Sequence, residues 1–157
     1  MPDNEADLPS ASPDEGGSAR RVVEQLSESE CLALLARERL GRLVYTSRFG
    51  PTALPVTYRL DEGSLVLGTW DPELFDEDLR TGIAHAEYHV AVEVDQIDVQ
   101  ERAGWLVLVW GPAHHLDTEA ERAPFIDAGL EPWIDGVPAH YIRLSPTTIW
   151  GNRTRQA

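Results

Sequence analysis

Short segments in which apolar and polar residues alternate dominate this chain, and they constrain its fold more than any other feature. Alternation with a period of two puts apolar side chains on one face of a β-strand, and turn residues such as Asp61-Glu62-Gly63 separate the segments. Pro55 has no backbone N–H, so we expect its strand at a sheet edge or a bulge, and we expect Gly111-Pro112 to bend another strand. The predicted strands cover residues 41–47, 53–60, 64–69, 88–95, 104–117, 140–145 and 147–151.

A helix is predicted to open the folded part of the chain. Ser27 and Glu30 have the spacing of a capping box, and Leu26 and Cys31 are placed as a hydrophobic staple. The apolar face of this helix includes Cys31, so we expect that thiol to be a buried core group and not a nucleophile.

Two more helices are expected between the strands. One begins at Asp71-Pro72 and runs to about Gly82, because proline suits the first position of a helix. The other begins at a capping box formed by Thr118 and Glu121 and ends at Gly129. Strands therefore dominate, with helices inserted into a meander, which favours a mainly β fold with flanking α-helices: an antiparallel barrel and not an alternating parallel sheet.

The large excess of acidic residues limits which kinds of partner this chain can bind. The net charge is −14, and all 13 basic residues are arginine. Residues 1–19 are predicted to be a disordered acidic tail, and residues 20–157 a single domain. Such a surface repels phosphate backbones and anionic lipids, so no nucleic acid and no membrane are expected as partners. The tail lacks a secretory pattern and the chain has a single cysteine, which together predict a cytoplasmic location.

No catalytic side chain stands out in the sequence. The glycine-rich phosphate loops, the Cys-x-x-Cys pair and the nucleophile elbow are all absent. His114 and His115 are neighbours in a strand and should point to opposite faces, and no metal site is expected from the histidines. The tryptophans, among them Trp110 and Trp150, are compatible with core and interface packing or with a planar ligand stacked at an interface.

The order of four segments resembles the pyridoxamine 5′-phosphate oxidase-like proteins, above all their short, uncharacterised bacterial members. The segments are LSESECLALLARERLGRLVYTS, ALPVTYRLDEGSLVLGT, VAVEVDQIDVQERAGWLVLVWGPAHHL and IRLSPTTIWGNR. They span roughly residues 26–153, and the most specific part is 90–111. The resemblance implies a six-stranded split β-barrel of the FMN-binding type that forms a homodimer, with two flavin mononucleotides in clefts between the subunits.

The resemblance also implies which residues would bind the cofactor. The strand segment that would lie along the isoalloxazine ring is Pro55, Val56, Thr57 and Tyr58. Gly68 and Thr69, at the end of the next strand, would lie near the phosphate, and Arg59 would bind that phosphate. Trp150, near the end of the chain, would approach the ring. Residues 70–78, where the family usually carries a serine and a basic residue, hold five acids and no base, so we expect the usual phosphate grip to be damaged or replaced here.

The resemblance therefore implies a flavin (FMN)-binding protein, and more specifically a flavin-dependent oxidoreductase of this family that acts on an unknown small molecule. No catalytic side chain is expected, because the cofactor carries the redox step. Two alternatives stay open. One is a barrel without a cofactor that serves as a binding or interaction module, which the acidic segment 71–78 favours. The other is a deazaflavin-dependent reductase on the same fold.

Overall fold

The computed structural model describes residues 20–70, 87–135 and 139–156. The predicted tail 1–19 and the predicted helix 71–82 lie outside these residues. The elements are β1 (Arg21–Gln25), α1 (Glu28–Leu35), β2 (Leu40–Ser47), β3 (Gly50–Asp61), β4 (Ser64–Thr69), β5 (Tyr88–Asp98), β6 (Ala103–His115), α3 (Glu119–Asp127), β7 (His140–Leu144) and β8 (Thr148–Gln156).

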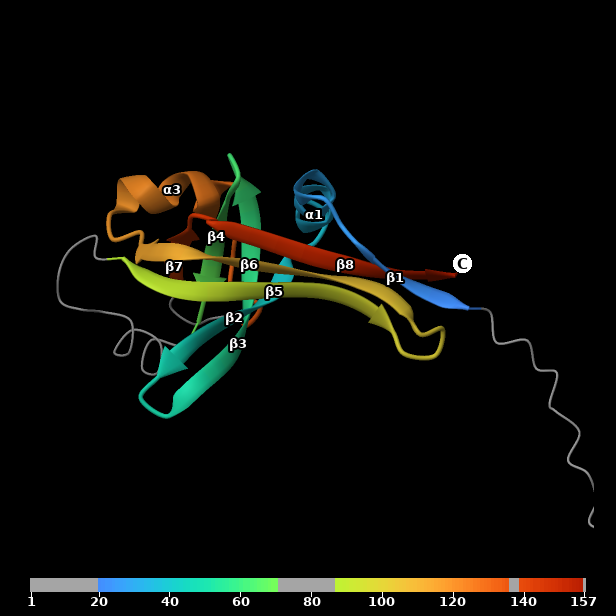
Figure 1. The fold of residues 1–157 in the computed structure, drawn as a ribbon. Helices are drawn as coiled ribbons and strands as arrows, with labels where there is room; N and C mark the ends of the chain where they lie inside the picture. The colour runs from blue at the N-terminus through green and yellow to red at the C-terminus, as the bar shows by residue number, and fades with distance from the viewer. Residues whose placement is uncertain (1–19, 71–86, 136–138, 157) are drawn as a thin grey trace, which may run out of the picture.

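The strands form one antiparallel sheet that closes on itself. Their order is β1-β8-β6-β5-β2-β3-β4-β7, and an additional pairing joins β7 to β6. Six strands therefore make a ring, which confirms the predicted six-stranded barrel, while β8 and β1 continue the sheet beyond it. Figure 1 shows these two strands and the long ends of β5 and β6 extending from the barrel as an arm, with α1 across it and α3 over the β7 end.

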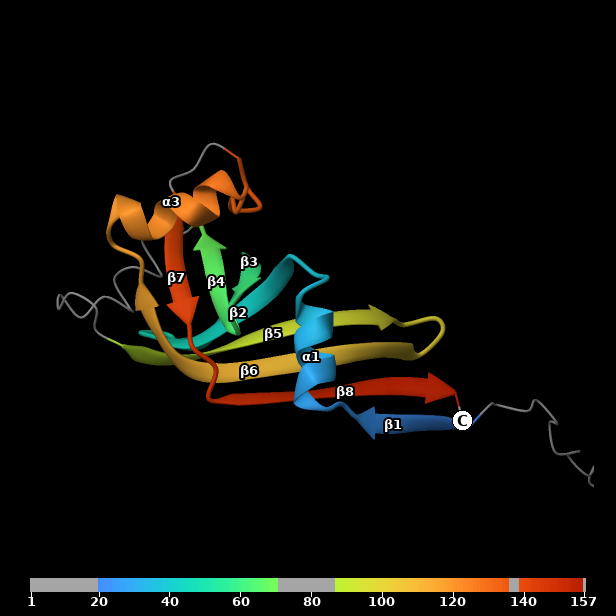
Figure 2. The same cartoon turned by 90° about the horizontal axis from the view of Figure 1, so that it is seen from above.

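The barrel and the arm separate at Gly111. Strand β6 pairs with β8 from Gly104 to Trp110 and with β7 from Ala113 to His115. The connection between β7 and β8 crosses β6 at this point, and the amides of Ser145 and Thr147 donate to backbone carbonyls on either side of Gly111. Figure 2 shows β6 turning toward β7 near its end. The bend predicted at Gly111-Pro112 is thus where β6 changes its partner.

Two apolar clusters stabilise this arrangement. The larger fills the barrel and the space under α1, and the smaller lies between α3 and the outer side of β4 and β7. Both predicted capping boxes form, and Cys31 is fully buried. Gly129 has the positive φ of +81° that ends a helix, as its position predicted. Pro55 pairs only with Arg42 of β2, because β4 joins β3 from Thr57 onward.

The structure corrects the prediction that the fold opens with a helix. Strand β1 precedes α1 and pairs along its whole length with the last strand, β8. Its sequence, RVVEQ, is mostly exposed and does not alternate, so nothing local marks it as a strand. The open edge of β8 supplies its hydrogen-bond partners, and β8 itself continues five residues past its predicted end at 151.

Candidate functional site

The predicted cofactor residues on β3 divide between the two faces of that strand. Val56 and Tyr58 point into the barrel and are 0% and 2% exposed, while Pro55, Thr57 and Arg59 point outward. The Tyr58 hydroxyl donates to the carbonyl of Leu35 at the end of α1, at 2.8 Å. Burial, followed by the nearby negative charge of Glu38, raises the pKa of Tyr58, which keeps its hydroxyl a donor. Because their side chains point into the barrel, Val56 and Tyr58 could contact a ligand on the outward side of β3 only through their backbone atoms.

The variant Tyr58→Phe tests this division. It removes the donor to a buried carbonyl, which we expect to cost about 1–2 kcal/mol of folding free energy. At this chain length that corresponds to a fall of roughly 2–8 °C in melting temperature, measured by circular dichroism. Flavin affinity should not change, because the hydroxyl faces the core; a loss of affinity without a loss of stability would place Tyr58 in the binding site.

The two residues predicted near the phosphate, Gly68 and Thr69, also face opposite ways. Gly68 pairs with Thr57, and the Thr57 hydroxyl donates to the Glu131 carbonyl at 2.6 Å. A Cβ at Gly68 would lie 3.0 Å from that hydroxyl oxygen and 3.7 Å from the Glu131 carbonyl carbon, so the segment after α3 covers this face. The Thr69 hydroxyl is buried and has no hydrogen-bond partner in the part of the chain that the structure describes.

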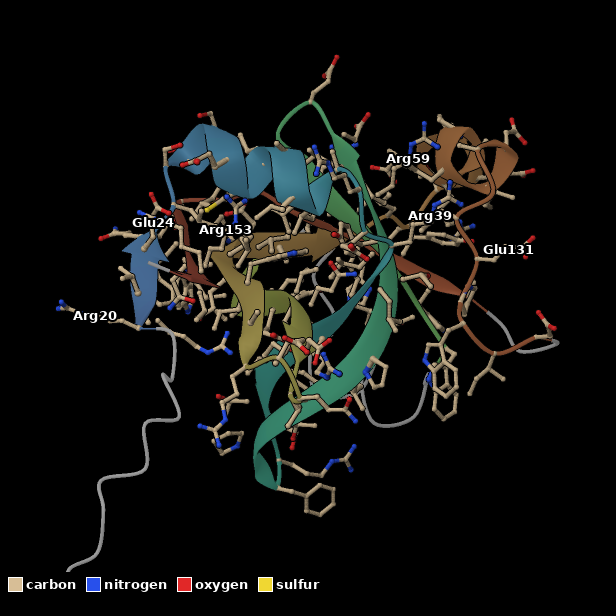
Figure 3. All side chains as sticks on the ribbon, turned by 90° about the vertical axis from the view of Figure 1, so that its right-hand side faces the viewer. Arg20, Glu24, Arg39, Arg59, Glu131 and Arg153 are labelled. Atoms are coloured by element: carbon tan, nitrogen blue, oxygen red, sulfur yellow. The ribbon has the colours of Figure 1, made fainter. Side chains whose placement is uncertain are left out.

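An open cleft lies beside the second half of β3, where Thr57, Tyr58, Arg59 and Leu60 line it. It has a volume of about 490 Å³ and lies between the end of α1, strand β3 and the end of α3. Figure 3 shows Arg39 and Arg59 together on this side of the molecule, with Glu131 nearby. Its lining residues are Leu35, Ala36, Glu38, Arg39, Thr57, Tyr58, Arg59, Leu60, Ala128, Gly129, Leu130 and Glu131.

Of the two arginines that line this cleft, Arg59 was predicted from the sequence as a cofactor residue and Arg39 was not. Arg39 lies in the connection between α1 and β2, and its carbonyl accepts a hydrogen bond from the Tyr58 amide at 2.9 Å. The signal available in the sequence was a group of three arginines, at 37, 39 and 42, within an acidic chain. That signal alone does not say which of the three would meet β3.

Trp150 lies far from the other predicted cofactor residues of the same chain. It lies on β8, and β6, β5 and β2 separate β8 from β3. With neighbouring strands about 4.8 Å apart, the two strands are roughly 19 Å apart along the sheet. One planar ring therefore cannot contact Trp150 and Thr57 of the same chain, and the predicted set is complete only if a second copy supplies one of them.

Trp150 belongs instead to a face that carries many exposed apolar side chains. We call this the outer face: the side of β1, β8, β6, β5, β2 and the first half of β3 that points away from the barrel interior. Strand pairing places alternate residues of these strands on it. Large exposed apolar residues on the outer face are Val23, Leu40, Ile97, Trp110 and Trp150, and Val44, Leu106 and Leu108 lie between them, half-buried.

The outer face carries a shallow groove and a cluster of ion pairs around Arg42. The groove, of about 260 Å³, runs between Pro51, Val44, Ala91 and Trp110. Arg42 lies 3.2 Å from Glu93 and 3.3 Å from Asp95. Burial and the neighbouring Asp95 raise the pKa of Glu93, and the Arg42 guanidinium opposes that shift. Arg42 therefore forms ion pairs with two carboxylates.

The histidines and acids of the described residues form no metal centre. His115 is buried and His114 is half-buried, as expected for neighbours on opposite faces of a strand. Within the described ranges, no group of three or more His, Cys, Asp or Glu side chains could hold a metal ion. No helix among these residues is long and apolar enough to cross a membrane.

A closed six-stranded antiparallel barrel with a two-stranded extension and an apolar outer face defines a split-barrel protein. Comparison with known proteins gives the family. The pyridoxamine 5′-phosphate oxidase family model matches residues 27–153, so the chain belongs to that family.

Three relatives illustrate how far the likeness extends. An uncharacterized protein of Mycobacterium tuberculosis is 32% identical over 136 residues, which is 87% of this chain and 88% of the relative. A solved candidate pyridoxamine 5′-phosphate oxidase from Corynebacterium glutamicum is 26% identical with a TM-score of 0.68, covering 87% of this chain and all of that one. The FAD-binding protein of Mycobacterium smegmatis is 30% identical with a TM-score of 0.63, covering 84% and 100%.

Proposed function

We propose that this protein is a flavin-binding oxidoreductase that works as a homodimer, holds flavin mononucleotide and acts on a small molecule. The observation that carries the proposal is the family membership, together with a relative 30% identical that binds FAD. The outer face supplies an apolar surface for such a cofactor, and two arginines, Arg39 and Arg59, line the cleft beside β3.

The described residues fit a flavin. A planar ring needs a flat, partly apolar surface, and β3 provides one up to Pro55 and Val56, where it pairs with β2 only and β4 has not yet joined it. The phosphate needs cations, and Arg59 points outward from the same strand. The hydroxyl of Thr69 is buried, like the side chains of Val56 and Tyr58, so in this conformation it cannot reach a phosphate on the outer face.

A bound flavin would supply the redox chemistry, accepting and returning a hydride or electrons. The chain's own groups would bind and orient it. The β3 backbone from Pro55 to Thr57 would lie along the ring, and Arg59 would neutralise the phosphate. Trp150 of a second copy would cover the ring and exclude water, since the tryptophan of the same chain lies too far along the sheet.

The outer face supports the proposed dimer. Exposed large apolar side chains gathered on one face are a signature of a protein interface. We infer that a second copy of the chain covers this face, bringing Trp150 of one copy toward β3 of the other. We place the activity in the cytoplasm, where the free thiol of Cys31 stays reduced.

An absorption spectrum of the gently purified full chain tests the proposal. We expect a visible flavin band at about one flavin per chain, restored by added flavin mononucleotide after its removal. A colourless protein that takes up neither flavin mononucleotide nor riboflavin would instead indicate a cofactor-free binding module. A deazaflavin spectrum would assign the redox function to a deazaflavin-dependent reductase.

A further inference from the structure

We propose that protonation of Glu93 controls how tightly the outer faces of two copies associate, so that the dimer weakens as the pH rises. This inference rests on the homodimer of the proposed function and adds a regulatory device to its interface. The device is the cluster of Arg42, Glu93 and Asp95. It carries one more negative charge than positive charge within a face that is otherwise rich in apolar side chains.

The cluster lies among the apolar side chains of the outer face and not at its border. In the sheet, Glu93 is placed between Arg42 of β2 and Leu108 of β6. Asp95 lies two residues further along β5, next to Leu106 of β6. A second copy that covers the apolar residues of this face must therefore cover both carboxylates as well.

Both carboxylates are already partly removed from water in a single chain. The side chain of Glu93 is 24% exposed and that of Asp95 is 30% exposed, whereas that of Arg42 is 53% exposed. One guanidinium nitrogen, Nη1 of Arg42, contacts both carboxylates, at 3.2 Å from Glu93 and 3.3 Å from Asp95. A single cation can neutralise only one of the two charges, so each copy keeps an excess negative charge on this face.

Association of two copies makes this excess charge more costly. It brings two such charges into one interface and removes water from them, and both changes favour the neutral form of a carboxyl group. Glu93 is the group that takes the proton, because it is the less exposed carboxylate and because burial, followed by the charge of Asp95, already raises its pKa in the single chain. A carboxyl whose pKa is higher in the dimer than in the free chain stabilises the dimer at low pH. That stabilisation is lost as the pH rises through the pKa that the group has in the dimer.

The strands around Glu93 supply one cation to the cluster, which is Arg42. Among the described residues, β8 and the part of β6 that pairs with it carry no ionisable side chain on the outer face, and β2 carries only Arg42 there. On β5 itself, His89 points to the same face but is four residues away, which is about 13 Å along the strand. Arg21 of β1 is separated from β5 by β6 and β8. His89 can gain charge over the same pH range, so it needs its own control.

The experiment measures the dissociation constant of the dimer of the full chain by sedimentation at about pH 5.5 and at about pH 8, on either side of the range in which a raised carboxyl titrates. For the wild type we expect a dissociation constant at least about tenfold higher at the higher pH. Glu93→Gln keeps the shape of the side chain and removes its charge, so this dimer should be as tight at the higher pH as at the lower. Glu101→Gln is the matched control, because Glu101 is an exposed acid in the turn between β5 and β6, outside the outer face; it should behave as the wild type does.

Two further variants separate the cluster from other causes of pH dependence. Arg42→Gln leaves both carboxylates without their cation, so its dimer should be weaker than that of the wild type at about pH 8 and more dependent on pH. His89→Asn should keep the pH dependence of the wild type.

The outcomes distinguish this device from the dimer on which it rests. If the wild-type dimer is equally tight at both pH values, if Glu93→Gln weakens it, or if His89→Asn abolishes the pH dependence, protonation of Glu93 does not control the interface, while the dimer itself stands. If the wild type sediments as a single chain at both pH values, the dimer and the device fail together. The flavin function is then still decided by the absorption spectrum.

Discussion

Replacing Gly111 with alanine is expected to destabilise the fold by about 3 kcal/mol, from overpacking together with the loss of backbone hydrogen bonds. An added Cβ would overlap the carbonyl oxygen of Ser145 and lie 3.0 Å from its carbon and 3.1 Å from the Thr147 nitrogen. All three atoms belong to the backbone where the β7–β8 connection crosses β6, so no side-chain rotation can relieve the overlap. Thermal denaturation should show a fall of about 6–12 °C.

Gly63→Ala is the control for this prediction. Gly63 lies in the turn between β3 and β4 with φ +81°, and no atom lies within 4 Å of the Cβ that it would gain. Its cost is therefore conformational only, about 1 kcal/mol. Equal losses of stability in the two variants would mean that close packing at the crossing does not constrain Gly111, and that β6 and the β7–β8 connection can move apart.

Replacing Trp110 with glutamate is expected to convert the proposed homodimer to monomers. Trp110 lies on the outer face beside the groove, and a two-fold interface would bury two copies of the new charge. A loss of about 2 kcal/mol for each copy is typical of a central interface tryptophan. Together these losses weaken the dimer about a thousandfold. Sedimentation at micromolar concentration should then show the mass of one chain for the variant and of two chains for the wild type.

Ile126→Glu provides the comparison at similar exposure. Ile126 is 45% exposed and Trp110 39%, but Ile126 is on α3, away from the outer face. This variant should remain a dimer with its melting temperature almost unchanged. A wild type that sediments as a single chain would remove the dimer from the proposed function, and with it the role of Trp150 as a cover for the flavin of the other copy.

Local sequence patterns predict some features of the candidate site and not others. Alternation along 53–60 was enough to assign that segment to a strand, and alternation dictates that Val56 and Tyr58 point to the side opposite Thr57. The sequence could not indicate that the segment after α3 would close over Gly68, because that contact joins residues more than sixty positions apart. The position of Arg39 beside β3 depends in the same way on the pairing of Tyr58 with a distant loop.

The sequence by itself determined the local structure of this protein: both described capping boxes, the strand segments, the edge position of Pro55 and the turn in β6 at Gly111. Each of these depends on atoms within a few residues of one another, so a short stretch of sequence contains all the information. Only the tertiary structure decided that β1 is a strand, that β7 closes the barrel on β6, and which arginines share a cleft. These features arise from pairing between distant segments, whose register and neighbours no local pattern specifies.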